Sequence, residues 1–225
     1  MSAVTISTTE ISIVSGTSTL QSVTTKGIYS LYIDASNMVK GDEFEVKIYD
    51  KVISGGTKRV AFRQTISDAQ SEMLVFPDIM LFNGWDMTIV KKGGSDQTFT
   101  ASIRAVTGAG LSDAYTQSAL TITTTEKSLI SGTTTLSADT TACKIQVWAD
   151  LSNLTLTNGD DLYIRIYEKC LTGGTKRLVY QAIQLDNQIE LFFTPVFTVM
   201  NGWDVTAVKV NGTNKTIDAA IRKVA

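Results

Sequence analysis

Apolar and polar residues alternate along several stretches of the chain with the two-residue period of a half-buried β-strand. The clearest stretch places three apolar side chains on one side of a strand: Phe44, Val46 and Ile48. The same pattern recurs later in the chain at three positions: Leu162, Ile164 and Ile166. No stretch shows the apolar stripe of an amphipathic helix. We therefore expect an all-β fold, with roughly seven strands in each half, arranged as a jelly-roll-like β-sandwich.

The second half of the chain repeats the first. Two motifs recur in the same order, Gly-Gly-Thr-Lys-Arg at 55–59 and 173–177, and Asn-Gly-Trp-Asp at 83–86 and 201–204. An insertion between Leu154 and Gly159 accounts for the change of spacing between the copies. Because the repeat runs to the end of the chain, it indicates duplication of a whole domain. We expect two tandem homologous β-sandwich domains and a Gly-bearing linker: 1–107, 115–225 and, between them, 108–114.

Each copy contains a hairpin that ends in the Gly-Gly-Thr motif. Keeping the apolar residues of both strands on one face predicts a three-residue loop at 55–57, with Val60 opposite Val52 and Phe62 opposite Asp50. This register puts an acid on the apolar side of the strand. We expect the end of the hairpin to extend beyond the core, so that Asp50 lies in water.

The Asn83-Gly84 pair is typical of a type I′ turn in a β-hairpin. Such a turn would place two apolar pairs opposite each other: Phe82 with Trp85, and Met80 with Met87. This hairpin phase also predicts that Trp85 and its repeat equivalent Trp203 belong to the core.

Composition narrows the classes of partner. The chain has 20 Lys and Arg against 22 Asp and Glu, a net charge of −2, and no long basic run, so we expect no nucleic-acid partner. It has no uncharged apolar segment long enough to span a bilayer, so we expect no membrane association. The N-terminal residues do not resemble a secretory signal, which points to synthesis in a cytoplasm.

The side chains offer little catalytic chemistry. The chain has no His, which removes His-based nucleophile systems and most transition-metal sites. Acids present in both copies are interpreted as structural rather than as a carboxylate pair of a glycosidase. Three pairs are interpreted as turn residues: Asp34 with Asp150, Asp42 with Asp160, and Asp86 with Asp204. The fourth pair, Asp50 with Glu168, is expected to lie beside the basic hairpin ends. An oxygen-rich cluster at 158–161 is a weak candidate for Ca²⁺. We expect no enzyme activity, no catalytic residue, no metal and no cofactor.

The two cysteines, Cys143 and Cys170, both lie in the second copy, and their first-copy counterparts are Gly27 and Val52. A disulfide framework would be expected in both copies. We interpret the two residues as small core thiols, while the possibility that they pair stays open.

The best candidates for contact with a partner lie around the repeated hairpins. The four basic residues at the hairpin ends and two tyrosines on the polar side of the preceding strands form this set: Lys58, Arg59, Lys176, Arg177, Tyr49 and Tyr167. The bases could equally be ordinary solvated hairpin ends, and the tyrosines could be covered by other parts of the protein. An aromatic platform for a glycan would need Trp148 together with Tyr163 and Tyr167.

The repeat unit resembles small β-sandwich virion proteins of tailed bacteriophages. The resemblance lies in Asp-x-Ser-Asn followed by Met or Leu, then Gly-Asp, then an alternating strand that ends in Ser/Thr-Gly-Gly-Thr-Lys-Arg. It implies a structural protein that decorates or cements a phage capsid. The major capsid protein or other virion proteins would be its partners, and it would form a homo-oligomer in the particle. A glycan-binding module and a tail or neck adaptor are the alternatives.

Overall fold

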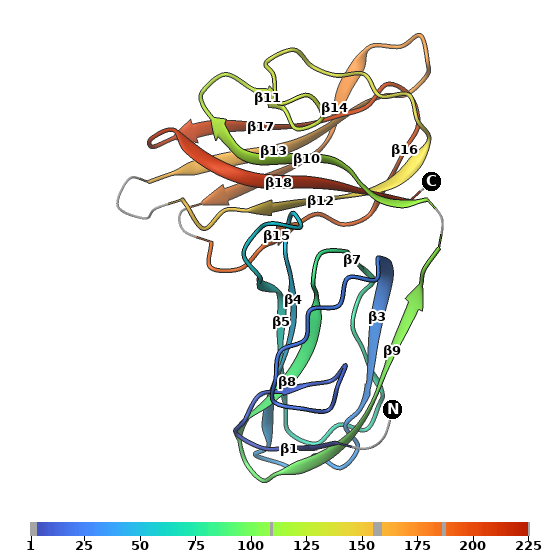
Figure 1. The fold of residues 1–225 in the computed structure, drawn as a ribbon, viewed down its shortest axis with the longest axis vertical. Coiled ribbons are helices and arrows are strands. Elements are labelled where there is room, and N and C mark those ends of the chain that lie inside the picture. The colour runs from blue at the N-terminus through green and yellow to red at the C-terminus, as the bar shows by residue number, and fades with distance from the viewer. Residues whose placement is uncertain (1–3, 109, 155–158, 186–187, 225) are drawn as a thin grey trace. The chain divides into compact units, whose positions relative to one another are not determined.

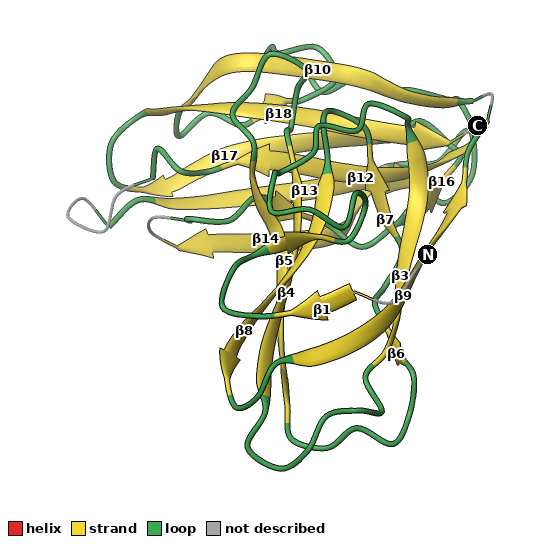
Figure 2. Ribbon diagram, turned by 60° about the horizontal axis from the view of Figure 1, so that its bottom comes forward, coloured by secondary structure: helices red, strands yellow, loops and turns green. Residues whose placement is uncertain are grey.

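A computed structural model describes residues 4–108, 110–154, 159–185 and 188–224. All regular structure in these ranges is β-strand, which confirms the predicted fold class (Figure 2). No part of the described chain forms a helix with the length and hydropathy that a membrane span needs. The chain forms two compact units, one built mainly from residues 1–109 and the other mainly from 110–225.

The first unit is a sandwich of two antiparallel sheets (Figure 1). One sheet has the order β1-β9-β3-β6, with β7 also paired to β3, and the other has the order β2-β8-β4-β5. The strands are β1 (Val4–Ile6), β2 (Ile11–Ser12), β3 (Gly27–Asp34), β4 (Glu43–Asp50), β5 (Arg59–Ser67), β6 (Leu74–Val75), β7 (Ile79–Leu81), β8 (Asp86–Gly93) and β9 (Gln97–Val106).

The second unit has the same strand order in both of its sheets. Its sheets run β10-β18-β12-β15, with β16 also paired to β12, and β11-β17-β13-β14. The strands are β10 (Leu111–Ile122), β11 (Lys127–Ser128), β12 (Cys143–Asp150), β13 (Asp161–Lys169), β14 (Lys176–Leu185), β15 (Phe192–Phe193), β16 (Phe197–Val199), β17 (Asp204–Asn211) and β18 (Lys215–Val224). β10 begins at Leu111, inside the stretch 108–114 that we expected to be a linker, because its first residues pair with the end of β18.

The core of each sandwich consists of the apolar side of the alternating strands. Phe44 of β4 is fully buried and meets Phe99 of β9 edge-to-face, with ring centroids 4.8 Å apart. Burial of each such side chain stabilises the fold by roughly 1.5–3 kcal/mol. Trp85 and Trp203 are also buried, as their phase predicted.

The predicted register of the hairpin between β4 and β5 is wrong by two to three residues, because β4 ends at Asp50 and β5 begins only at Arg59, so that the connection is longer than the predicted three-residue loop. Phe62 pairs with Ile48 rather than with Asp50, and Val60 pairs with Tyr49 rather than with Val52, with a β-bulge between these two pairs. Asp50 is buried rather than in water. Its carboxylate accepts the backbone N–H groups of residues 82 and 83, each at 3.0 Å, which provides the hydrogen bonds that a buried carboxylate needs.

The predicted hairpin around Asn83-Gly84 does not form. β7 pairs with β3 in one sheet, and β8 lies in the other sheet, so this turn carries the chain from one layer of the sandwich to the other. Gly84 has φ 83°, which suits glycine, and Asp50 holds the preceding amides. The Asn-Gly pair thus marks the turn correctly, whereas the strands that it joins are set by the buried acid and the sheet pairing.

Candidate functional site

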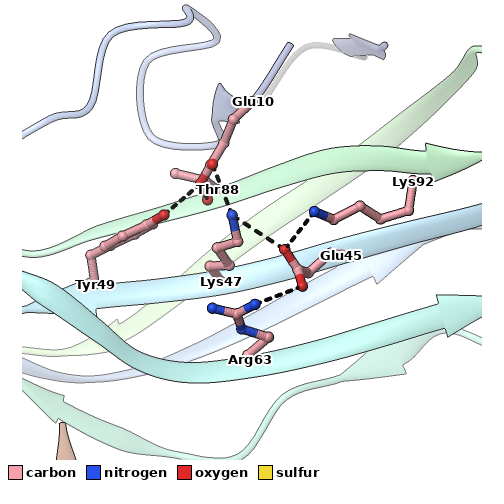
Figure 3. Close-up of polar contacts among 7 residues, drawn as sticks. All are labelled: Glu10, Glu45, Lys47, Tyr49, Arg63, Thr88 and Lys92. Carbon is pink, nitrogen blue, oxygen red and sulfur yellow. Dashed lines mark hydrogen bonds and ion pairs between the residues drawn. The ribbon is translucent and has the colours of Figure 1, made fainter. Parts of the chain in front are cut away.

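A cluster of polar and charged side chains covers the outer side of the sheet β2-β8-β4-β5 (Figure 3). Strand β4 supplies three of its members, because the alternation that buries Phe44 turns their side chains outward. We call this set the charged face: Glu10, Glu45, Lys47, Tyr49, Arg63, Thr88 and Lys92.

Glu10, just before β2, anchors one end of the charged face. Its carboxylate accepts hydrogen bonds from Lys47 Nζ at 2.9 Å, from the Tyr49 hydroxyl at 2.9 Å and from Thr88 Oγ1. Burial alone would raise the pKa of the Glu10 carboxyl, but the hydrogen bonds from Thr88 and its neighbours outweigh burial and lower the pKa. Burial and the bond to Glu10 raise the pKa of Tyr49 to about 12.

Glu45 forms the other end of the charged face. Its two oxygens lie 3.2 Å from Lys47 Nζ, 3.2 Å from Lys92 Nζ and 3.1 Å from an Arg63 nitrogen. Burial opposes ionisation of Glu45, yet the bases, Lys47 first, lower its pKa. Lys47 therefore lies between two carboxylates, which raise its pKa despite its burial. With two acids and three bases, the charged face has an excess of one positive charge.

The second unit keeps only the Glu10 end of this arrangement. Glu126 accepts hydrogen bonds from Thr206 Oγ1 at 2.6 Å, the Tyr167 hydroxyl at 3.1 Å and an Arg165 nitrogen at 3.3 Å. The repeat provides no second carboxylate here. The positions of the charged face that hold Glu45, Arg63 and Lys92 are occupied in the second unit by Tyr163, Gln181 and Val210.

The hairpin bases are more constrained than a solvated hairpin end would require. Lys58 Nζ donates to the carbonyl of Gln21, and Lys176 Nζ donates to the carbonyl of Ser137. Burial lowers the pKa of both lysines. These lysines therefore hold each hairpin against the preceding loop.

The neighbouring arginines lie one residue further along. Arg59 is half-buried and lies opposite Asp50 in the register of β4 and β5, whereas Arg177 is exposed. Of the six contact candidates, Tyr49 and Tyr167 are bonded to a glutamate on the outer side of their sheets, and Lys58 and Lys176 are anchored. Arg177 is the one residue of these six whose exposure places it on the open surface.

The aromatic platform suggested for a glycan is absent, because Trp148 is buried. Its ring stacks on Phe193 with centroids 5.1 Å apart, and the Arg222 guanidinium lies 3.9 Å from its ring centroid. Trp148 belongs to β12, whereas Tyr163 and Tyr167 belong to β13 in the other sheet of the unit. The three aromatics therefore cannot form one surface.

The repeated acids act on the backbone, as expected for turn residues. Asp86 accepts hydrogen bonds from Ser12 Oγ and from the amides of Gln21 and Met87, all at 2.8 Å. Asp204 is held in the same way by Ser128 Oγ and two amides. Burial raises the pKa of both carboxyls.

The Ca²⁺ candidate lies partly outside the described residues, which do not include Asn158. Asp160 already accepts a hydrogen bond from the Thr213 amide at 2.9 Å and lies 3.2 Å from Lys215 Nζ, so a cation of the chain occupies the place of a metal. Within the described ranges, no group of three or more metal-ligating side chains comes together.

The two cysteines differ. Cys143 is buried, as the interpretation of a core thiol predicted, and Cys170 is exposed, which contradicts it. The cause is the hairpin: β13 ends at Lys169, so Cys170 falls in the loop that follows the strand. The two thiols are unpaired.

Sequence reasoning missed the glutamates that organise the outer faces. The signal was present, because Thr-Thr-Glu at 8–10 recurs at 124–126. A glutamate retained in both copies just before a short strand has a local structural role in each unit. Its partners on β4 and β8 are distant in sequence, so the pairing itself could not be read from the motif.

Comparison with known proteins gives only weak likeness. No protein-family model matches the chain, and no curated protein matches its sequence. Among solved structures, the PBSX exported protein XepA is 9% identical with a TM-score of 0.35, and the match covers 100% of this chain and 85% of that one. A tandem CBM22 domain of Xyn10C from Paenibacillus barcinonensis is 10% identical with a TM-score of 0.26, covering 89% and 79% of the two chains. At these values neither likeness says anything about what this chain binds.

Proposed function

We propose that this chain is a non-enzymatic virion protein that decorates or cements the capsid of a tailed bacteriophage through its two repeated β-units. Its partner in this proposal is the major capsid protein. The sequence resemblance of each repeat to phage decoration proteins supports the proposal. The repeated acids serve turns and strands, which is consistent with a structural role.

The single observation that carries the proposal is the exact repetition of strand order in the two units. Each unit presents an equivalent hairpin, held at its loop end by Lys58 or Lys176. A capsid offers many copies of one site on adjacent subunits. Once one unit is bound, the second binds from a high effective concentration, so two modest contacts give a strong attachment.

The hairpin arginines fit this role because they stand beside anchored lysines. A lysine that is bonded to a loop carbonyl restricts the motion of its hairpin, so the neighbouring arginine loses less conformational entropy on binding. Arg59 and Arg177 would then contact acidic groups on the capsid surface, with a dependence on salt that is typical of such pairs.

Quantitative mass spectrometry of purified virus particles tests the proposal. Hundreds of copies per particle would support attachment to the shell. A handful of copies would move the protein to the tail or neck, and absence from particles would refute the proposal and leave a binding module, including one for glycans, as the next class to test.

A paired variant then tests the contact itself. We expect Arg59→Glu together with Arg177→Glu to weaken binding of the full chain to capsids that lack it by about tenfold or more per charge-reversed contact. Lys127→Glu, which reverses a charge away from the hairpins, is the control. Equal binding by both variants would contradict a contact through the hairpin ends.

A further inference from the structure

Strand β14 forms an open edge of the second unit. It lies at the end of the sheet β11-β17-β13-β14 and, among the strands that the structure describes, pairs only with β13. From Tyr180 to Leu185 this pairing is regular. The outward N–H and C=O groups of such a strand are free to pair with another strand, and proteins normally protect them with charges, bulges or very short strands.

The equivalent edge of the first unit has that protection, and β14 does not. Strand β5 carries Arg63 in its middle and exposed Thr65 and Ser67 beyond it. Between Arg177 and the end of β14 there is no charged residue. Four apolar side chains on this strand are 46–52% exposed: Leu178, Val179, Ile183 and Leu185.

Other edges among the described strands are protected in recognisable ways. β10 is long, but two register shifts interrupt it, and Ala119 has φ 50° there. β1, β6 and β15 contain only two or three residues each. β14 is the edge that combines length with an uncharged stretch of eight residues, 178–185.

The apolar character of β14 continues onto the sheet. Ile183 lies opposite Tyr163 of β13, and Val210, which replaces a lysine of the charged face, is 40% exposed. We call this set the apolar face: Tyr163, Leu178, Ile183, Leu185 and Val210. On this side of the sheet the hydrogen-bonded pair Arg165 and Gln181 separates Leu178 from the other members of the apolar face. Exposed apolar side chains beside an open edge favour an interaction site over an ordinary solvated surface.

We propose that β14 pairs antiparallel with β14 of a second copy of this chain, joining the two apolar faces across a two-fold axis. A strand that meets its own copy antiparallel brings the N-terminal end of each opposite the C-terminal end of the other. Exposed Arg177 stands at one end of β14, and Asp161 lies opposite Leu185 at its other end. The two-fold arrangement therefore puts base near acid twice. With Gln181 near the axis, it also places Val179 of each copy opposite Ile183 of the other.

The mass of the full chain in solution tests this pairing without any capsid, so its outcome is independent of the proposed function. Sedimentation equilibrium from micromolar to several hundred micromolar should give twice the 24.4 kDa monomer mass at the higher concentrations. A monomer mass throughout this range would overturn the proposal, even if another protein were found to bind β14.

The unprotected edge can be given the charge of its counterpart. Gln181→Arg places on β14 the residue that β5 carries at this position, and we expect it to return the mass to that of a monomer. Thr65→Arg adds the same charge to the exposed edge β5 and should leave the dimer intact. A Gln181→Arg protein that is folded by circular dichroism and still dimeric would place the interface elsewhere.

A covalent test does not depend on weakening the dimer. In a Cys170→Ser background, Gln181→Cys lies near the two-fold axis, where opposed Cα atoms come within the range that a disulfide can span. Mild oxidation should give a covalent dimer, whereas Thr65→Cys in the same background should not. Equal cross-linking of the two variants would count against pairing through β14.

Discussion

The outer sides of two equivalent sheets differ sharply although their backbones are repeats. In the first unit, Glu10 and Glu45 pair with three bases to form the charged face (Figure 3). In the second unit, Glu126 keeps its bonds to Thr206 and Tyr167, but the Glu45 end is replaced by the apolar face. The strand order is preserved by the core and the glutamate anchor, whereas the rest of each surface has diverged.

The two faces differ in the free energy that is gained or lost when a partner covers them. The charges of the first unit are already paired with one another, and covering this face would remove the partly exposed bases Arg63 and Lys92 from water, which opposes burial. An apolar face gains roughly 25 cal/mol for each Å² that a partner removes from water. The first unit therefore has a face suited to water, and the second has one that gains free energy when it is covered.

The largest expected difference between the units concerns the acids at the hairpins. Asp50→Ala leaves two buried backbone amides without an acceptor and should lower the free energy of unfolding of the first unit by about 3 kcal/mol. Glu168 accepts the amides of Met200 and Asn201, but it is only half-buried, so Glu168→Ala should cost the second unit about 1 kcal/mol.

Hydrogen exchange, followed separately in peptides from each unit, measures both effects in one chain. Each substitution should increase exchange in its own unit more than in the other. Equal losses for the two variants would show that the difference in burial between Asp50 and Glu168 does not control their contributions.

These acids also show where sequence reasoning stops. Alternation predicts which side of β4 is buried, and the repeated motifs predict the duplication, because both depend on near neighbours in the chain. The burial of Asp50 depends on a turn at 82–83 and on a bulge that moves the hairpin register by one residue. Trp148 likewise lies on the polar side of its strand by alternation and is nevertheless buried against Phe193 and Arg222, which are distant in sequence.

The candidate site was predicted only in part for the same reason. The phase of β4 and β13 placed Tyr49 and Tyr167 on the outer side, which is where they lie. Their bonds to Glu10 and Glu126 connect segments about forty residues apart, and no local pattern specifies such a pairing. The hairpin lysines were found as exposed bases, yet the loop carbonyls that bind them follow from the fold of the preceding loop.

Acid should affect the charged face in a direction that its pKa shifts define. The pKa values of Glu10 and Glu45 lie below the ordinary value of 4.5, so their stabilisation is fully present above pH 4.5 and is lost as the pH falls through the lowered values. Asp86 and Asp204 have raised pKa values in equivalent positions, so their opposite effects largely cancel between the units.

The free energies of unfolding of the two units can be compared by hydrogen exchange from neutral pH to acid. Below pH 4.5 the first unit should lose more stability than the second. In the double variant Glu10→Gln with Glu45→Gln this acid-dependent difference should become smaller. The lowered pKa values of Asp34 and Asp42 in the first unit, and of Asp139 in the second, account for the part that remains. If the double variant keeps the same pH dependence as the parent chain, the charged face is not its source.

The smallest effect, and the most local, concerns the hydroxyl that Glu10 holds. Burial and the bond to Glu10 raise the pKa of Tyr49 to about 12, and burial together with the bond to Asp139 raises the pKa of Tyr115 to about 12. Tyr49→Phe should remove one of the two tyrosine titrations near pH 12 from the absorbance curve. It should also lower the free energy of unfolding of the first unit by about 1 kcal/mol. Glu10→Gln should instead keep the titration of Tyr49 and move it to lower pH, because a neutral acceptor opposes the phenolate less than a carboxylate does. Circular dichroism at each pH restricts the titration to the folded chain. If the titration of Tyr49 is unchanged in the Glu10→Gln variant, burial alone raises the pKa of Tyr49. The hydrogen bond between this tyrosine and its glutamate, which the second unit repeats with Tyr167 and Glu126, would then be weaker than its geometry implies.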